Sequence, residues 1–335
     1  MAYTTVPYSN PSNALDLFYD WAGGIAVGAV TNPYVWTRNY TAVEGKGKRA
    51  HISKTINGLD CYFNFRSATA ETLGTYGSAI ASGIAVNGST GYISDAGATA
   101  WNKQTGYTND SYYGSGVGAF GNVDKLLATG GTLHFFATAT TLTAVFETDS
   151  VFGDWRMFTV GNVGGTIFYA SSGGTLNSTD STPPSMYDAR SMYLTDNYVG
   201  GYSSHGYAAC YIPGDRWYIS ANSNALSSTY RLFHLVSGNH SASTPAPTIA
   251  ASLASPILSY SPESLRGNAQ LAPSHIMLNK GTSYEAYPVG DIEGIKSINM
   301  TNYTTGQEVT YGSDTYKFFR VMNTDYMLAG VAILK

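Results

Sequence analysis

The sequence predicts an all-β protein, built on one or two antiparallel β-sandwiches with one or two short helices near the N-terminus. Three observations support this fold class. Only 12% of the 335 residues are charged, about half the usual share of a soluble domain. Glycine and tyrosine are abundant, with 37 and 27 copies. Short runs of aromatic and β-branched residues alternate with Gly, Asn and Ser turns, which is typical of sandwich strands.

The clearest helix candidate covers residues 12–21. Ser12 can cap its N-terminus, because a serine hydroxyl accepts a hydrogen bond from a free amide of the first turn. Apolar residues then recur at helical spacing, and a glycine pair ends the run. These residues are Leu15, Phe18 and Tyr19, followed by Gly23 and Gly24. A second short helix is expected at 67–80, although two internal glycines weaken it.

An extended stretch at 25–41 leads to the one local cluster of basic residues. Four cations and a histidine stand close to one acid and two glycines, which favours a solvated loop. A patch that contacts an anion or a protein partner is the alternative. The cluster consists of Glu44, Lys46, Lys48, Arg49, His51 and Lys54, of which Lys46, Lys48 and Arg49 are the contact candidates.

Strands are expected along most of the remaining chain. The first is LDCYFNF at 59–65, after which a Gly/Asn/Ser/Tyr-rich excursion at 83–118 reads as loop. Four short strands between 131 and 172 suggest an antiparallel meander, with a turn at Gly161 and Asn162. Further strands are expected at 206–212, 216–220, 230–236, 292–298, 308–310, 316–322 and 327–334, with loops at 171–186 and 237–249.

The loop at 237–249 is a candidate linker. It divides the chain into a main sandwich domain at 1–250, which includes the N-terminal helical segment and long Gly/Asn-rich loops, and a β-rich segment at 251–335. That last segment is either a separate unit or the completion of the same sandwich.

Charge and hydropathy exclude several classes of function. The formal net charge is −4 and is spread evenly, so no basic domain is present to neutralise nucleic-acid phosphates. No apolar run approaches the ~20 residues that cross a bilayer, and the N-terminus lacks the pattern of a secretory signal. Cys61 and Cys210 lie in strand-like runs and are expected to be small buried residues of a protein made in a reducing cytoplasm.

No motif with the spacing of a catalytic, cofactor or metal site occurs, so the sequence predicts a protein without enzymatic activity, cofactor or metal. The six histidines form no HxH or HExxH pair. The best case for an enzyme is a glycosidase or polysaccharide lyase, which needs two facing carboxylates. Its candidate acids are Glu147, Asp149, Asp154 and Asp215, near Arg156 and Arg216.

Exposed aromatic side chains could instead contact a host-surface glycan without catalysis. Aromatic faces pack on sugar rings, although most aromatics in such a chain are expected to fill the core. The candidates are Trp155, Trp217, Tyr218, Tyr112 and Tyr113, the last two in the sequence GYTNDSYY at 106–113.

Two passages carry a resemblance to a known group of proteins. The first is WRMFTVGNVGGTIFYAS at 155–171, and the second is LRGNAQLAPSH at 265–275. Gly294-Ile-Lys296 and Gly312-Ser-Asp-Thr-Tyr316 follow in the same order, and the passages at 59–67 and 83–89 precede them. This arrangement resembles virion structural proteins of tailed bacteriophages. The chain departs from their pattern at Gln270, where they have Gly, and in lacking a Trp after the Ser-Asp-Thr strand.

The resemblance implies a non-enzymatic component of the phage tail, baseplate or neck, which binds copies of itself and other virion proteins. Abundant tyrosine suits that role, because it provides a large contact area at low entropic cost. A tail module that binds host-surface glycan is the first alternative, and a polysaccharide-degrading tail enzyme is the second. The resemblance supplies no catalytic residues.

Overall fold

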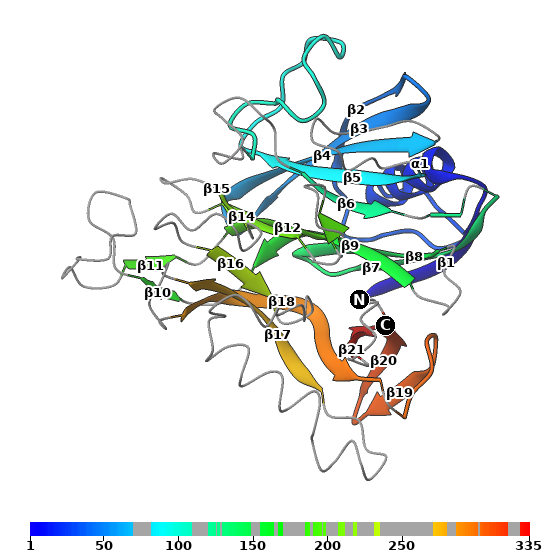
Figure 1. Cartoon of the computed structure of the whole chain (residues 1–335), viewed down its shortest axis with the longest axis vertical. Helices are drawn as coiled ribbons and strands as arrows, with labels where there is room; N and C mark the ends of the chain where they lie inside the picture. The colour runs from blue at the N-terminus through cyan, green and yellow to red at the C-terminus, as the bar shows by residue number, and fades with distance from the viewer. Residues whose placement is uncertain are drawn as a thin grey trace.

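The computed structural model describes most of the N-terminal half and parts of the remainder. The described residues are 1–69, 82–108, 120–124, 126–127, 129–148, 155–163, 167–169, 185–187, 190–195, 197–198, 207–211, 217–219, 231–234, 271–279, 286–300, 302–320 and 329–335. They form an all-β structure of antiparallel sheets with one helix (Figure 1). The predicted fold class is therefore confirmed.

Sheet 1 has six strands in the order β13-β6-β5-β4-β3-β2. Its strands are β2 (Thr37–Glu44), β3 (Gly47–Ile56), β4 (Leu59–Thr69), β5 (Ser82–Ser89), β6 (Gly121–Asp124) and β13 (Asn197–Tyr198). Sheet 2 has seven strands in the order β1-β7-β8-β9-β12-β14-β15. They are β1 (Ala2–Tyr8), β7 (Gly131–Ala137), β8 (Thr141–Glu147), β9 (Trp155–Val163), β12 (Arg190–Thr195), β14 (Tyr207–Tyr211) and β15 (Trp217–Ile219).

Sheet 3 has six strands in the order β16-β17-β18-β21-β20-β19. They are β16 (Arg231–His234), β17 (Ala272–Asn279), β18 (Ala286–Asn299), β19 (Glu308–Tyr311), β20 (Asp314–Phe319) and β21 (Ala329–Leu334), and a separate ribbon pairs β10 (Ile167–Tyr169) with β11 (Ser185–Tyr187). Because β16 pairs with β17, residues 231–234 belong to the same sheet as the C-terminal strands.

Sheets 1 and 2 pack face to face, and the helix α1 (Pro11–Ala22) contributes to their shared core. Phe18 of α1 lies 5.1 Å from Phe65 of β4 and 4.9 Å from Phe158 of β9, measured between ring centroids. Trp21 of α1 stacks on Phe135 of β7 at 5.3 Å. Alternate residues of a strand point to one face, so the apolar set of β4 that includes Phe63 and Phe65 fills this core. Cys61 is buried there too, as expected.

The helix begins slightly earlier than the sequence suggests. Asn10 is the N-cap, and its side-chain oxygen accepts a hydrogen bond from the Asn13 amide at 2.9 Å. Pro11 occupies the first helical position, where its missing N–H costs nothing. Ser12 is therefore inside the helix, and its hydroxyl contacts the Ser67 hydroxyl at 3.0 Å. Of the second predicted helix, residues 67–69 belong to β4 and 70–81 lie outside the described residues.

Sheet 3 covers the outer face of sheet 2, so that the three sheets form successive layers (Figure 1). Phe319 of β20 contacts His134 and Phe136 of β7 and Trp155 of β9. The two chain termini lie near each other at this junction, and the Lys335 ammonium sits 5.1 Å from the centre of the Tyr3 ring.

Several elements differ from the sequence predictions. The basic cluster forms the β2–β3 hairpin instead of a solvated loop, because Gly45 has a φ of 54° and allows a tight turn. The expected turn at Gly161 and Asn162 lies inside β9. Strands β1, β5 and β17 were not expected as such. Among the described residues, no helix has the length and apolar character required to cross a bilayer.

Candidate functional site

The outer face of sheet 1 carries a row of polar side chains across four strands. Tyr40 of β2 stands opposite His51 of β3, His51 opposite Asn64 of β4, and Asn64 opposite Asn87 of β5. Directly opposed residues of antiparallel strands point to the same face. His51 is only 1% exposed, and Asn64 and Asn87 are equally buried. Polar side chains therefore replace the apolar ones that fill the opposite face of the same strands.

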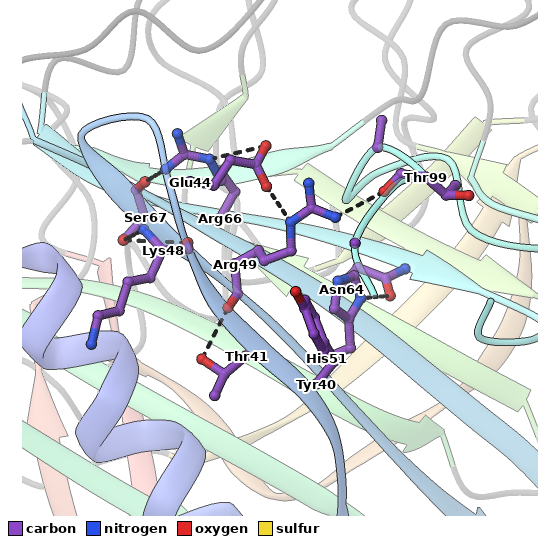
Figure 2. A network of polar contacts seen from close by, with 12 residues as sticks. Tyr40, Thr41, Glu44, Lys48, Arg49, His51, Asn64, Arg66, Ser67 and Thr99 are labelled. Carbon is purple, nitrogen blue, oxygen red and sulfur yellow. Dashed lines mark hydrogen bonds and ion pairs between the residues drawn. The ribbon is translucent and has the colours of Figure 1, made fainter. Parts of the chain in front are cut away.

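The neighbouring row contains two buried arginines beside one acid. Arg49 stands opposite Arg66 in the strand pair, and Glu44 at the end of β2 lies beside both (Figure 2). The Glu44 carboxylate accepts a hydrogen bond from Arg49 Nε and lies 3.5 Å from Arg66 Nε. Arg66 is only 2% exposed. Since buried charges need partners, Glu44 holds two guanidinium groups in place.

His51 is a neutral hydrogen-bonding residue in this network. Burial lowers the pKa of His51 to about 4, with Arg49 contributing in the same direction. Its Nδ1 lies 2.7 Å from Asn64 Oδ1, and Asn64 Nδ2 donates to the Ser89 hydroxyl at 3.0 Å. Because a carbonyl oxygen only accepts, Nδ1 of His51 carries the proton. The rings of Tyr40 and Tyr92 pack near the imidazole, at 6.1 and 5.2 Å.

The segment 90–108 covers this polar face without forming a helix or strand of its own. Arg49 Nη1 donates to the Thr99 carbonyl at 2.8 Å, and Tyr40 Oη donates to the Ala96 carbonyl at 3.0 Å. Thr108 N donates to the Gly88 carbonyl at 2.8 Å. Side chains of the sheet thus donate hydrogen bonds to backbone carbonyls of the covering segment. Buried carbonyl groups need such partners, and this segment has no regular structure to provide them.

Two further contacts shape the covering segment itself. The Asp95 carboxylate accepts hydrogen bonds from the Thr99 hydroxyl and from the Thr99 and Gly97 amides, and these bonds lower the pKa of Asp95. Trp101 packs over the small side chains of Ala68 and Ala85. The segment is therefore fixed both by the polar contacts of Asp95 and by the aromatic contact of Trp101.

This network can position a loop, and its geometry shows no reactive pair. His51 has Asn64 as its partner where a catalytic base would have a nucleophile. Within the part of the chain that the structure describes, no group of three or more His, Cys, Asp or Glu side chains could hold a metal ion.

A second buried histidine lies on the outer face of sheet 2, beneath sheet 3. His134 Nδ1 is 2.9 Å from Tyr3 Oη, and the rings of Trp155 and Phe319 both lie 5.1 Å from the imidazole. Burial lowers the pKa of His134 to about 4, and the nearby Lys317 ammonium acts in the same direction. We call this contact between sheets 2 and 3, formed by Tyr3, His134, Phe136, Trp155 and Phe319, the aromatic seam.

The structure brings together only some of the residues selected from the sequence. Arg49 belongs to the buried network, Lys48 pairs with Asp16 of α1, and Lys46 is exposed in the β2–β3 turn. Trp155 lies in the aromatic seam. Tyr112 and Tyr113 lie outside the described residues, and for Trp217 and Tyr218 the structure describes only their backbone in β15.

Of the four carboxylates considered for an enzyme, only Glu147 belongs to the described residues. Glu147 Oε2 accepts a hydrogen bond from the Thr132 amide at 2.8 Å, and its carbonyl accepts one from Tyr8 Oη at 2.5 Å. Asp149, Asp154 and Asp215 lie outside the described residues.

Sequence reasoning missed the partners of Arg49. The signal was present as an alternation of polar residues with period two in β3, β4 and β5, which places them on one face. These polar residues are Arg49 and His51, Asn64 and Arg66, and Asn87 and Ser89. Their assembly into rows depends on strand order and register, which the sequence does not state.

The outer edge of sheet 1, at β2, lies next to this site. Within the described residues, β2 is the last strand and pairs with β3 alone. Val43 of β2 is 75% exposed, and Val35, just before the strand, is 52% exposed. A bulge between Arg38 and Tyr40 interrupts the first half of the strand, so Thr41–Glu44 is its regular half.

Comparisons with known proteins give no family assignment. No protein-family model matches the chain, and no curated protein sequence matches it at a significant level.

Proposed function

We propose that this protein is a non-enzymatic structural component of a tailed phage particle, in its tail, baseplate or neck, and that it assembles with copies of itself and with other virion proteins. The observation that carries the proposal is the open edge of sheet 1 at β2, with a strongly exposed valine. Unpaired strand edges template pairing with another chain, and native proteins usually cover them. A neighbouring subunit in a symmetric assembly is a common cover.

Two further features support a structural role. Two buried arginines of neighbouring strands in sheet 1, Arg49 and Arg66, are held together by Glu44. The sequence resembles virion proteins in the order of its strands and turns, and its low charge and high tyrosine content suit large contact surfaces.

The native mass of the purified chain over a wide concentration range tests the proposal. The monomer has a mass of 35.7 kDa. We expect a fixed symmetric multiple of this mass, and we expect Val43→Lys to lower the multiple by placing a charge on the pairing edge. Ser94→Lys is the matched control, since it adds the same charge to an exposed position of the covering segment.

A monomer at every concentration would contradict self-assembly through β2. Host-surface glycan binding would then be assayed before any enzymatic activity, with Trp217 and Tyr218 as the first positions to substitute.

A further inference from the structure

We propose that sheet 3 is a cover that acid releases from the outer face of sheet 2, with His134 as the trigger. The inference concerns a conformational device and does not depend on the particle in which the protein works. It follows from the composition of the aromatic seam, where one ionisable imidazole is enclosed between two sheets.

His134 is enclosed between sheets 2 and 3. Its ring contacts Tyr3 of β1, Trp155 of β9 and Phe319 of β20, so groups from both sheets surround it. Phe319 is fully buried and belongs to the covering sheet. The imidazole therefore loses most of its water only when sheet 3 is in place, and separation of the sheets returns it to solvent.

Charged groups of sheet 3 lie close to the imidazole of His134. On sheet 3, the Lys317 and Lys335 ammonium groups lie 5.8 and 5.1 Å from the centre of the Tyr3 ring. Both lysines pair with one acid, Glu308, at 3.2 and 3.0 Å. On sheet 2, the hydrogen-bonding partner of His134 is the Tyr3 hydroxyl, whose own pKa is raised by burial. A protonated His134 would add a third cation beside one carboxylate.

Protonation of His134 favours the open state over the closed one. Burial, with Lys317 acting in the same direction, lowers the pKa of His134 to about 4 in the closed state, whereas an exposed histidine titrates near 6.5. The open state therefore binds more protons, and acid favours it. The contribution of neutral His134 to the docking of sheet 3 is therefore complete above pH 6.5 and is lost as the pH falls toward 4. Between pH 6.5 and 4.5, the opening equilibrium constant is expected to rise about 40-fold.

Opening of the aromatic seam leaves the core between sheets 1 and 2 intact. The core between sheets 1 and 2 is built from α1 and from strands of both sheets, and it includes no described residue of sheet 3. Sheet 3 has its own apolar cluster of Ile298, Met300, Tyr316, Phe318 and Ala332. Sheets 1 and 2 thus keep their shared core and sheet 3 keeps its own apolar cluster when the seam opens, and the seam would then expose aromatic surface.

Hydrogen exchange of the full chain, read by mass spectrometry and corrected for intrinsic exchange rates, tests the proposal. On acidification, we expect faster exchange in β20 and β21, with β4 unchanged as the internal reference. Binding of a dye that recognises exposed apolar surface should rise over the same pH range. His134→Gln should remove this pH dependence, since the amide fits a hydrogen bond to Tyr3 but does not titrate.

Lys317→Met provides a second variant that leaves the histidine in place. Because Lys317 disfavours the protonated imidazole, its removal should raise the pKa of His134 in the closed state. The pKa difference between the closed and open states then becomes smaller, so sheet 3 should be released at lower pH in the same exchange measurement. The proposal is overturned if β4 opens together with β20, if His134→Gln opens at the same pH as the original chain, or if Lys317→Met leaves the midpoint unchanged.

Discussion

The two outer faces of the sandwich both carry a buried histidine under a cover, yet the covers are held differently. On sheet 1, His51 lies in a polar network under the segment 90–108, with hydrogen bonds from side chains to backbone carbonyls. On sheet 2, His134 lies among aromatic rings under sheet 3. Burial lowers the pKa of both histidines to about 4.

The difference follows from what each cover must satisfy. A segment without regular structure brings unpaired backbone groups, so a polar face suits it. A sheet pairs its own backbone and presents side chains, so an apolar face suits it. Arg49 and Tyr40 perform the first task, and Phe136 and Phe319 perform the second. The substitutions below separate these two modes of covering a sheet.

Phe319→Ala should have the largest effect on the aromatic seam. Removing a fully buried phenylalanine costs about 4 kcal/mol, and here the loss falls on the contact between sheets 2 and 3. We expect earlier unfolding of sheet 3 in urea, with hydrogen exchange in β20 rising well before β4. Phe63→Ala, the same change in the core of sheets 1 and 2, should instead lower the stability of the sandwich itself. Equal effects of the two substitutions on β4 would contradict a separable cover.

Glu44→Gln should have the largest effect on the polar face. It leaves Arg49 and Arg66 without their carboxylate, and breaking a buried ion pair costs about 3 kcal/mol. Urea unfolding monitored by circular dichroism measures the change. The matched control is Asp16→Asn, which removes the exposed pair with Lys48 and should cost under about 1 kcal/mol. If Glu44→Gln lowered the free energy of unfolding by as little as the control does, the polar network would contribute little to the stability of the protein.

The free energy of unfolding should fall in acid through His51 as well as His134. The pKa of His51 is about 4 in the folded protein and near 6.5 when unfolded, so the unfolded state binds more protons. Stability is then complete above pH 6.5 and falls toward pH 4, by about 3 kcal/mol for this group. His51→Gln should flatten that part of the pH profile. A profile that is unchanged by the substitution would exclude His51 as a source.

Tyr40→Phe should have the smallest effect, and a local one. It removes the hydrogen bond to the Ala96 carbonyl, which is worth about 1 kcal/mol. We expect faster amide exchange in 93–99 with no change in the aromatic seam. Unaltered exchange in 93–99 would mean that the contacts of Arg49 and Asp95 are sufficient to fix this segment without Tyr40.

The sequence predicts elements whose apolar pattern is local. LDCYFNF predicted β4, and the spacing of Leu15, Phe18 and Tyr19 predicted α1. It failed for β3, because Lys48, Arg49 and Lys54 conceal the alternation of Ala50, Ile52 and Ile56. β1 was missed because threonines and Pro7 interrupt its pattern.

The candidate site was less predictable than the fold. Arg49 was selected from a local charge cluster, but its partners Glu44, Arg66 and Thr99 come together only through strand register and a covering segment. Trp155 was selected as an exposed aromatic, and its contacts with His134 and Phe319 depend on the packing of a sheet from the other end of the chain. Long-range pairing of this kind leaves no local signal.

Hydrogen exchange of the β2 amides in dilute and concentrated protein tests assembly through the edge of sheet 1. We expect amides within Thr41–Glu44 to become protected as the native mass rises, and we expect Val43→Lys to prevent both changes. Protection of β2 that does not change while the mass rises, or a mass that never rises above that of the monomer, would contradict it.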